Sequence, residues 1–384
     1  MTVLFWIAIV SLLLYVVVAL DVIVGNRKVQ ALRDVSPFSM AGPTLRVSII
    51  VAARNEERHI REALQSLLDL SYPDYELIVV DDRSEDRTGR ILDEMATWSA
   101  RLKVIHIDQL PPGWLGKNHA LWVGSRHASG DLLLFSDADI IMEPTVLNRA
   151  VLFMEQHKLD HLAATPSMCM PTTFLSMFGA AFIIFFSLFA RPWKAGDPNS
   201  RCHIGIGAFN LLRAEAYRQV GGHETIRLRP DDDIKLGKII KLAGLRQDVA
   251  YAPDFLAVEW YATVGEVIRG LEKNAFSGAD YNIPLVLAGV VLHVVGSIWP
   301  FLAVFLTRGV TQGISIATVV LIIIVFADCA RFHRTKAWYV LGYPLATALF
   351  VFILLRTMLL NLIQGGICWR GTFYSLKELK TNRI

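Results

Sequence analysis

The sequence predicts an α/β domain with a mostly parallel β-sheet, joined to membrane-spanning helices at both ends of the chain. In the middle of the 384 residues, short runs rich in β-branched residues alternate with segments of helical periodicity. Hydrophobic residues make up 53% of the chain, and mean hydropathy is +0.42. This excess lies at the two ends, whereas most charged residues lie within about 45–165 and 200–280. The pattern indicates a polar domain held between membrane segments.

The first apolar run, residues 3–24, is long enough to cross a bilayer core of about 30 Å. A cleaved signal peptide is the alternative, but no positively charged stretch precedes the run. Arg27, Lys28 and Arg33 follow it, and such basic residues stay in the cytoplasm. We therefore predict an N-terminal transmembrane anchor over 1–26 in a multi-pass protein of the cell membrane, with the polar domain cytoplasmic.

Three apolar runs near the C-terminus predict a transmembrane region over 283–364, followed by a basic tail over 365–384. The runs are residues 285–306, 314–327 and 339–363. Pro344 and Arg356 lie in the last run, which favours a bent or re-entrant segment over a simple crossing. Four simple spans would place the basic tail outside, against the preference of basic residues for the inside. One late run is therefore expected not to cross, and the sequence leaves open which.

A shorter apolar run lies within the polar region, at about 174–190. It ends in Arg191, Pro192 and Trp193, a basic and aromatic edge. We expect a helix in the membrane interface, or a buried helix, rather than a span.

Strands and helices alternate along the first part of the polar domain. The predicted strands are 47–52, 75–80, 102–107 and 132–135, and predicted helices follow at 60–68, 88–98 and 120–128. Asp81-Asp82 and Asp137/Asp139 come at the ends of two of these strands. Because ligands bind beyond the carboxyl ends of parallel strands, both acidic clusters are expected at one crevice.

Charge and cysteine content exclude several classes of protein. The formal net charge is only +3, and no basic block with interleaved aromatic residues occurs, so nucleic acid is not an expected partner. The four cysteines, Cys169, Cys202, Cys329 and Cys368, have no spacing typical of a zinc site or a redox pair.

Asp137-Ala138-Asp139 can offer carboxylate oxygens to Mg²⁺ or Mn²⁺, which complete their shell with phosphate oxygens and water. The alternative is an acidic turn that caps the next helix.

Lys117 precedes the predicted helix 120–128 and could neutralise a phosphate as a point charge. Its alternative is a solvated surface lysine.

Three adjacent carboxylates, Asp231, Asp232 and Asp233, open an amphipathic stretch. The helix dipole favours carboxylates there and keeps one ionised, as a general base requires. Ordinary N-capping explains one aspartate well and three less well. Asp231 also lies four residues before Lys235, which predicts a plain helix pair.

Together these segments resemble a known family. Residues 47–57, 79–88, 116–120, 137–139 and 231–244 resemble, in order and spacing, the inverting family 2 glycosyltransferases of GT-A fold. The resemblance covers about 45–280 and implies a cytosolic GT-A domain there. The membrane ends and the closing Trp369-Arg370-Gly371-x-x-Tyr374 are similar to the subgroup that glycosylates carotenoids and hopanoid-type lipids.

The resemblance implies roles on the donor side of the site. Ala53 and Glu56 would line the nucleotide-base pocket, and Asp82 would contact the uridine part. Lys117 would approach the diphosphate, while Asp137 and Asp139 would hold the donor phosphates and the divalent cation.

On the acceptor side, the family's base motif falls on Asp232-Asp233, counted back from Gly244. Asp233 takes the base position, with Asp232 as its rival. The family implies transfer of a sugar from a nucleotide-sugar donor, a UDP-sugar by resemblance, to a hydroxyl of a membrane lipid with inversion. The alternatives are transfer to polyprenyl phosphate or an exported polysaccharide, and a non-enzymatic binding protein. The Gln-x-x-Arg-Trp motif of processive synthases is not found after the base.

Overall fold

The computed structural model describes residues 3–37 and 45–384, so the first two residues of the predicted anchor lie outside it. The chain forms two compact units. We call Val29–Ser167, Pro192–Glu259 and Ile384 the α/β unit, and Met1–Lys28, Met168–Arg191 and Trp260–Arg383 the helical unit. Both are built from segments far apart in the sequence.

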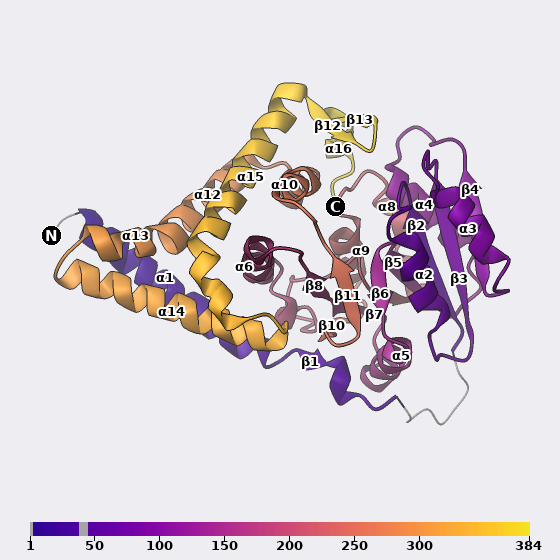
Figure 1. Cartoon of the computed structure of the whole chain (residues 1–384), viewed down its shortest axis with the longest axis horizontal. Coiled ribbons are helices and arrows are strands. Elements are labelled where there is room, and N and C mark those ends of the chain that lie inside the picture. The colour runs from indigo at the N-terminus through magenta and orange to yellow at the C-terminus, as the bar shows by residue number, and fades with distance from the viewer. Residues whose placement is uncertain (1–2, 38–44) are drawn as a thin grey trace. The chain divides into compact units, whose positions relative to one another are not determined.

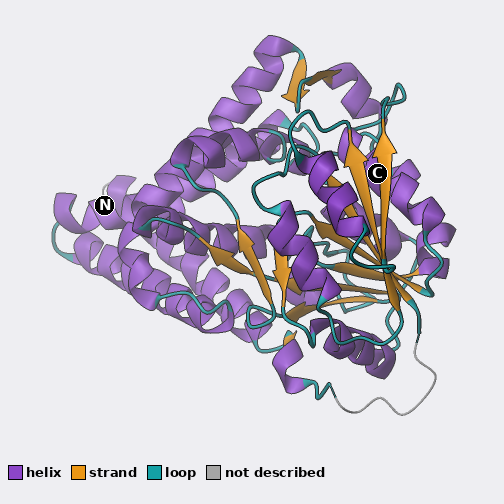
Figure 2. Ribbon diagram, turned by 45° about the vertical axis from the view of Figure 1, so that its right-hand side comes forward, coloured by secondary structure: helices purple, strands orange, loops and turns teal. Residues whose placement is uncertain are grey.

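An eight-stranded sheet is the centre of the α/β unit, in the order β1-β10-β7-β9-β5-β2-β3-β4 (Figure 2). Only β9 runs antiparallel to its neighbours β5 and β7, which confirms the prediction of a mostly parallel sheet. The strands are β1 (Gln30–Ala31), β2 (Val47–Ala53), β3 (Tyr75–Asp82), β4 (Leu102–Ile107), β5 (Leu132–Asp137), β7 (His161–Thr165), β9 (Asn210–Arg213) and β10 (Gln247–Tyr251). Two short strands, β6 (Ile140–Met142) and β11 (Leu256–Glu259), pair antiparallel beside it.

The central strands are buried almost throughout because helices cover the sheet, as long apolar runs in parallel strands require. Register then aligns their carboxyl ends: Ala53 pairs with Asp81, and Ala52 pairs with Asp137. The two acidic clusters predicted to share one edge of the sheet do so.

Helices of the α/β unit connect these strands. They are α2 (Ile60–Leu68), α3 (Thr88–Ala96), α4 (Gly116–His127), α5 (Val146–His157), α7 (Ala214–Gln219), α8 (Gly222–Thr225) and α9 (Asp232–Leu242), with 3₁₀ turns η1 (Leu32–Asp34) and η2 (Pro192–Lys194). The predicted start of α4 at Ala120 is wrong: the helix begins at Gly116. Its first turn, in which the backbone N–H groups have no helical acceptor, therefore contains Lys117.

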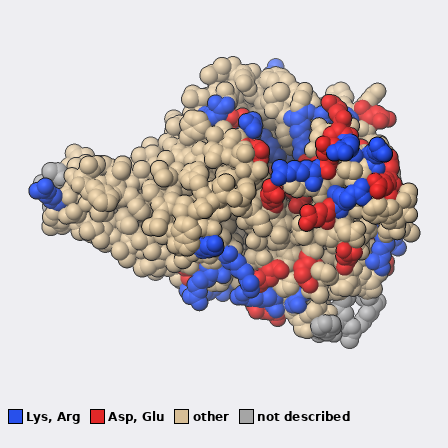
Figure 3. Space-filling model, in the orientation of Figure 1, with Lys and Arg blue, Asp and Glu red and all other residues tan. Residues whose placement is uncertain are grey.

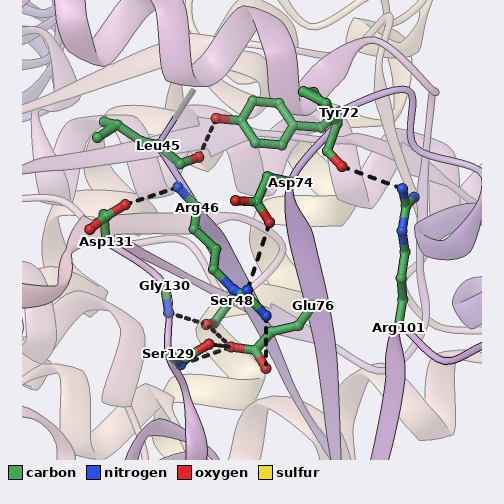
Figure 4. Close-up of polar contacts among 11 residues, drawn as sticks. Leu45, Arg46, Ser48, Tyr72, Asp74, Glu76, Arg101, Ser129, Gly130 and Asp131 are labelled. Atoms are coloured by element: carbon green, nitrogen blue, oxygen red, sulfur yellow. Dashed lines mark hydrogen bonds and ion pairs between the residues drawn. The ribbon is translucent and has the colours of Figure 1, made fainter. Parts of the chain in front are cut away.

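At the amino ends of β2, β3 and β5, a polar network closes the edge of the sheet opposite the acidic clusters (Figure 4). Glu76 Oε1 accepts hydrogen bonds from Ser48 Oγ at 2.6 Å, Ser129 Oγ at 2.7 Å and Ser129 N at 2.8 Å. Burial raises the pKa of Glu76, but these hydrogen bonds outweigh it and the pKa is lowered. The network ties the loop before β5 to both neighbouring strands.

The helical unit holds the apolar segments. It contains α1 (Val3–Asn26), α6 (Thr173–Ala190), α10 (Val264–Glu272), α11 (Ala275–Gly278), α12 (Ile283–His293), the π-helical η3 (Val294–Ile298), α13 (Trp299–Leu306), α14 (Val310–Phe332), the 3₁₀ helix η4 (Ala337–Gly342), α15 (Tyr343–Gln364), β12 (Gly366–Trp369), β13 (Thr372–Ser375) and α16 (Leu376–Thr381). A short strand, β8 (Ser167–Cys169), lies where the chain passes between the units.

Within the described residues, five helical segments are long and apolar enough to cross a membrane: Val3–Asn26, Thr173–Lys194, Ile283–Leu306, Val310–Phe332 and Ala337–Gln364. The predicted bend at Pro344 is not found, because this proline stands in the first turn of α15, where it is tolerated. Arg356 Nε lies 2.6 Å from Glu272 Oε1 of α10.

Candidate active site

A lysine joins two acidic segments of the α/β unit. Lys117 Nζ lies 2.8 Å from Asp137 Oδ1, at the end of β5, and 3.2 Å from Asp232 Oδ2, in the first turn of α9. Burial lowers the pKa of Lys117, but the carboxylates of Asp137, Asp232 and Asp233 outweigh it and raise the pKa well above its usual value. Lys117 is therefore a fixed cation and not a solvated surface lysine.

A small cavity surrounds this ion pair. It is lined by Lys117, Leu121, Phe135, Ser136, Asp137, Gly207, Asn210, His223, Asp232 and Asp233. Four of these were singled out from the sequence as site residues, and the fold brings them together from β5, α4 and α9. The lining combines the carboxylates and Lys117 with the apolar side chains of Leu121 and Phe135, as is common in ligand sites.

Asp233 has surroundings different from those of Asp232. Gly207 N donates a hydrogen bond of 2.9 Å to Asp233 Oδ2, and Ile234 N donates one of 2.8 Å to Oδ1. Burial, and then the charge of Asp232, raise the pKa of Asp233 to about 7. A carboxylate that titrates near neutrality is suited to accept and release a proton.

Gly207 was missed by the sequence analysis. Its carbonyl oxygen accepts a hydrogen bond of 3.0 Å from Asp137 N, so one residue contacts both Asp137 and Asp233. A Cβ at this position would lie 2.5 Å from Asp137 Oδ2, so a side chain has no room. Gly205 packs more closely still, since a Cβ there would lie 1.8 Å from the carbonyl oxygen of Asp233. The only sequence signal is Gly205-Ile206-Gly207 itself, which is too common to identify a site.

Asp139 follows β5, in the turn before β6. Burial, then the charges of Asp137 and Glu56, raise its pKa to about 7. Neighbouring carboxylates with raised pKa values favour a cation between them. No group of three or more His, Cys, Asp or Glu side chains poised to hold a metal is found in the described part of the chain. Two carboxylates nevertheless fit Mg²⁺ or Mn²⁺, whose other ligands are commonly phosphate and water.

The predicted donor-side residues lie at the ends of β2 and β3. Ala53 is buried in the last position of β2, and Glu56 N donates to Thr88 Oγ1 at 2.8 Å. Both oxygens of Asp82 accept hydrogen bonds from Arg83, at 2.7 and 3.0 Å. A Cβ on Gly116 would lie 2.2 Å from Asp82 Oδ2, so the start of α4 packs directly on this carboxylate.

Asp231 forms the predicted helix pair with Lys235, but as part of a buried network that was not predicted. Its two oxygens each lie 3.1 Å from Arg229, and Oδ2 lies 3.5 Å from Lys235 Nζ. The Arg229 side chain is 0% exposed and those of Asp231 and Lys235 5%. Asp231 therefore has a structural role in fixing the turn before α9, and only Asp232 and Asp233 line the cavity.

Part of the chain matches a known family domain, and the whole chain is similar to known glycosyltransferases. Residues 48–221 match the family described as "Glycosyl transferase family 2". The 4,4'-diaponeurosporenoate glycosyltransferase of Staphylococcus aureus strain USA300 is 24% identical over 342 residues, which cover 86% of this chain and 89% of that protein. The protein of the same name from the bovine strain RF122 is 24% identical over 383 residues, covering 96% and 98%.

Among solved structures, the mannosyltransferase PcManGT from Pyrobaculum calidifontis, in complex with GDP-Man and Mn²⁺, superposes with a TM-score of 0.58 at 19% identity. The match covers 94% of this chain and 99% of that one, and at this identity it shows the fold. The α/β unit has the expected GT-A-like fold, and residues 48–221 match the glycosyl transferase family 2 domain.

Proposed function

We propose that the protein transfers a sugar from a nucleotide-sugar donor to a hydroxyl of a membrane lipid, with inversion at the anomeric carbon. The observation that supports this most is the ion pair of Lys117 with both Asp137 and Asp232. It joins a cation suited to a diphosphate with a carboxylate suited to a metal, and it lies beside Asp233, which is suited to proton removal. Inversion is the general outcome in this family.

In the proposed reaction Asp233 takes the proton from the acceptor hydroxyl as its oxygen attacks the anomeric carbon. The bond between that carbon and the donor diphosphate breaks, and the bonding electrons leave with the nucleoside diphosphate. Asp233 is preferred over Asp232 as the base because its pKa is raised to about 7. Asp232 is instead paired with Lys117, which holds it as an anion and orients the lysine.

Lys117 places a positive charge next to the donor diphosphate. It stabilises the negative charge that develops on the nucleoside diphosphate as the bond to the sugar breaks. The N-terminus of α4 adds backbone N–H groups with the same preference for phosphate. Ala53 and Asp82 end strands β2 and β3, and Glu56 lies in the loop after β2, where a nucleotide base would be held at the carboxyl edge of the sheet.

Asp137 and Asp139 would hold Mg²⁺ or Mn²⁺. When bound, the cation would neutralise charge on the donor diphosphate. The raised pKa of Asp139 beside Asp137 and Glu56 supports this assignment, because a cation would relieve the repulsion among these carboxylates. Mn²⁺ accompanies the donor in the PcManGT structure.

The lipid acceptor is supported by relatives named for glycosylating 4,4'-diaponeurosporenoate and by the apolar helices of the helical unit. The basic residues after α1 support a cytoplasmic α/β unit in a multi-pass membrane protein. An acceptor whose oxygen is already ionised, such as polyprenyl phosphate, would not need the base.

The test uses purified full-length protein, radiolabelled UDP- and GDP-sugars, and lipid extracts from cells with and without the gene. We expect one labelled, lipid-soluble product that carries the mass of a sugar and disappears with excess EDTA. The Asp139→Asn variant should lose metal-dependent donor binding as well as turnover. Full turnover in EDTA would refute the metal assignment, and a labelled water-soluble polymer would refute the lipid acceptor.

A further inference from the structure

Five helical segments of the described chain could cross a membrane, and contacts among distant segments decide which of them do. The first is α6. The segment before it provides β5 and β7, and the segment after it provides β9, which pairs with both strands. A single crossing by α6 would place these strands on opposite sides of the bilayer. Since they form one sheet, α6 does not cross.

The same reasoning applies to the chain after Glu259. Ile384 belongs to the α/β unit: Lys238 Nζ donates to its oxygen at 2.5 Å, and its side chain packs against the apolar cluster that includes Leu236 and Ile240. Glu259 belongs to the same unit. An even number of crossings must therefore separate these two residues, although three candidate segments lie between them.

Contacts within the helical unit show which segment is excluded. Asn26 Nδ2 and Arg27 Nη2 donate to Asp328 at 3.0 and 2.9 Å, so α1 and α14 are parallel. Both helices end beside residues 26–28, after which the chain enters the α/β unit. The three residues 307–309 join α13 to α14 as a tight hairpin. The segment Ile283–Leu306 and α14 are thus the pair that crosses.

The remaining helix, α15, starts beside Tyr15 and Ser297, midway along α1 and the segment Ile283–Leu306, and runs back toward the side on which α12 begins. Tyr343 OH lies 3.4 Å from Ser297 Oγ, and the Phe350 ring contacts His293 at the end of α12, with 5.3 Å between the ring centroids. Arg356 then reaches Glu272, which precedes α12. In Figure 1, α15 runs across the direction of α1 and α14, and α6 is seen along its axis.

One face of α15 is left uncovered by residues 3–37 and 45–384, the described part of the chain. Leu345, Phe352, Leu359 and Ile363 are 64%, 49%, 51% and 80% exposed, and their spacing places them on one side of the helix. Basic residues stand at both ends of this face, in Arg334 and Lys336 before it and Arg370 and Lys377 after it. An apolar face with basic ends fits the headgroup boundary of an anionic leaflet. Figure 3 shows that the surface over α1, α13 and α14 is almost without charge.

We propose that the chain crosses the bilayer three times, through α1, the segment Ile283–Leu306 and α14, and that α15 lies in the cytosolic leaflet on its face of Leu345, Phe352, Leu359 and Ile363. The loop on the far side has a single basic residue, Arg308, whereas the flanks on the near side have many. The basic tail therefore stays in the cytosol. This inference rests on the proposed membrane location but not on the proposed reaction.

The test labels single cysteines with an impermeant thiol reagent in intact and permeabilised cells. Cys169, Cys202 and Cys368 are replaced by serine, and buried Cys329 is kept, after the background itself is shown not to react. We expect Arg308→Cys to react in intact cells, and Glu62→Cys and Thr381→Cys to react only after permeabilisation. Labelling of Thr381→Cys in intact cells would mean that α15 crosses. Protection of Arg308→Cys would refute the hairpin.

Two further measurements keep the proposal testable if that background does not fold. Green fluorescent protein fused after Ile384 should fluoresce. This protein does not mature when it is exported unfolded across the membrane, so fluorescence reports a cytosolic C-terminus.

Phe352→Lys and Ile323→Lys form a matched pair, since the native side chains are 49% and 42% exposed near the middles of α15 and α14. Ile323→Lys should lower the ratio of inserted to non-inserted protein by about 100-fold, whereas Phe352→Lys should change it little. Equal losses would mean that both helices cross. Activity is assayed separately, so a failed topology and a failed reaction are distinguishable.

Discussion

Lys117 and Asp232 form an ion pair of 3.2 Å between the first turns of α4 and α9. This pair makes two adjacent aspartates chemically different. Asp232 faces a permanent cation, whereas Asp233 accepts a hydrogen bond from Gly207 and has its pKa raised to about 7 by burial and by Asp232. The structure thus separates an aspartate that positions the lysine from one that can exchange a proton.

The first prediction concerns this difference. Asp233→Asn should keep donor affinity and lower kcat roughly 10²-fold, the usual scale for a lost general base. Asp232→Asn should mainly raise KM for the donor, because Lys117 loses one of its two ion-pair partners. Steady-state kinetics of both variants with the same donor and acceptor measure the split. The opposite pattern would make Asp232 the base, and two active variants would indicate an acceptor that is already ionised.

The second prediction concerns Gly207. Gly207→Ala should lower kcat at least about 10-fold, because the added Cβ meets Asp137 Oδ2 and shifts the peptide that holds Asp233. Gly278→Ala is the control, since an added Cβ there meets nothing within 4 Å. Yield and thermal unfolding are measured alongside kcat for both variants. Wild-type kcat in Gly207→Ala would show that this close approach does not matter for catalysis.

The third prediction concerns the stability of the network around Asp231. Asp231→Asn should lower the free energy of unfolding by about 3–5 kcal/mol, because it leaves buried Arg229 and Lys235 without their shared carboxylate. Asp69→Asn, at an exposed position that accepts from Gln65, should cost at most about 0.5 kcal/mol. Denaturant unfolding of the two variants compares them. Similar small losses would mean that the network contributes little.

The fourth prediction concerns pH. His161 is fully buried, and burial lowers its pKa to about 4 although Asn210 opposes the shift. The unfolded chain, with the ordinary pKa near 6.5, binds the proton more readily between about pH 6.5 and 4. Folding stability should therefore fall by up to about 3 kcal/mol as pH falls through this window. His161→Gln should remove that part of the dependence. An unchanged slope in the variant would assign the acid sensitivity to other groups.

Local sequence patterns were enough to predict most of the elements. The strands at 47–52, 75–80, 102–107 and 132–135 were predicted because apolar β-branched runs between turns have few other stable conformations. The acidic clusters at their ends were placed at one edge because parallel strands point their carboxyl ends the same way. Errors of a few residues, as at the start of α4, reflect caps made by tertiary contacts, such as Leu115 N to Arg227 O.

Sequence alone determined the α/β class, the family resemblance and the apolar segments, because periodicity, turn residues and hydropathy are properties of neighbouring residues. Tertiary structure decided what depends on distant residues. It buried Asp231 beside Arg229, placed Gly207 between Asp137 and Asp233, and set Lys117 between two aspartates. The proposed placement of α15 depends on distant residues too: hydropathy measures whether a helix can enter a membrane, whereas crossing depends on which strands and which terminus its flanking segments must join.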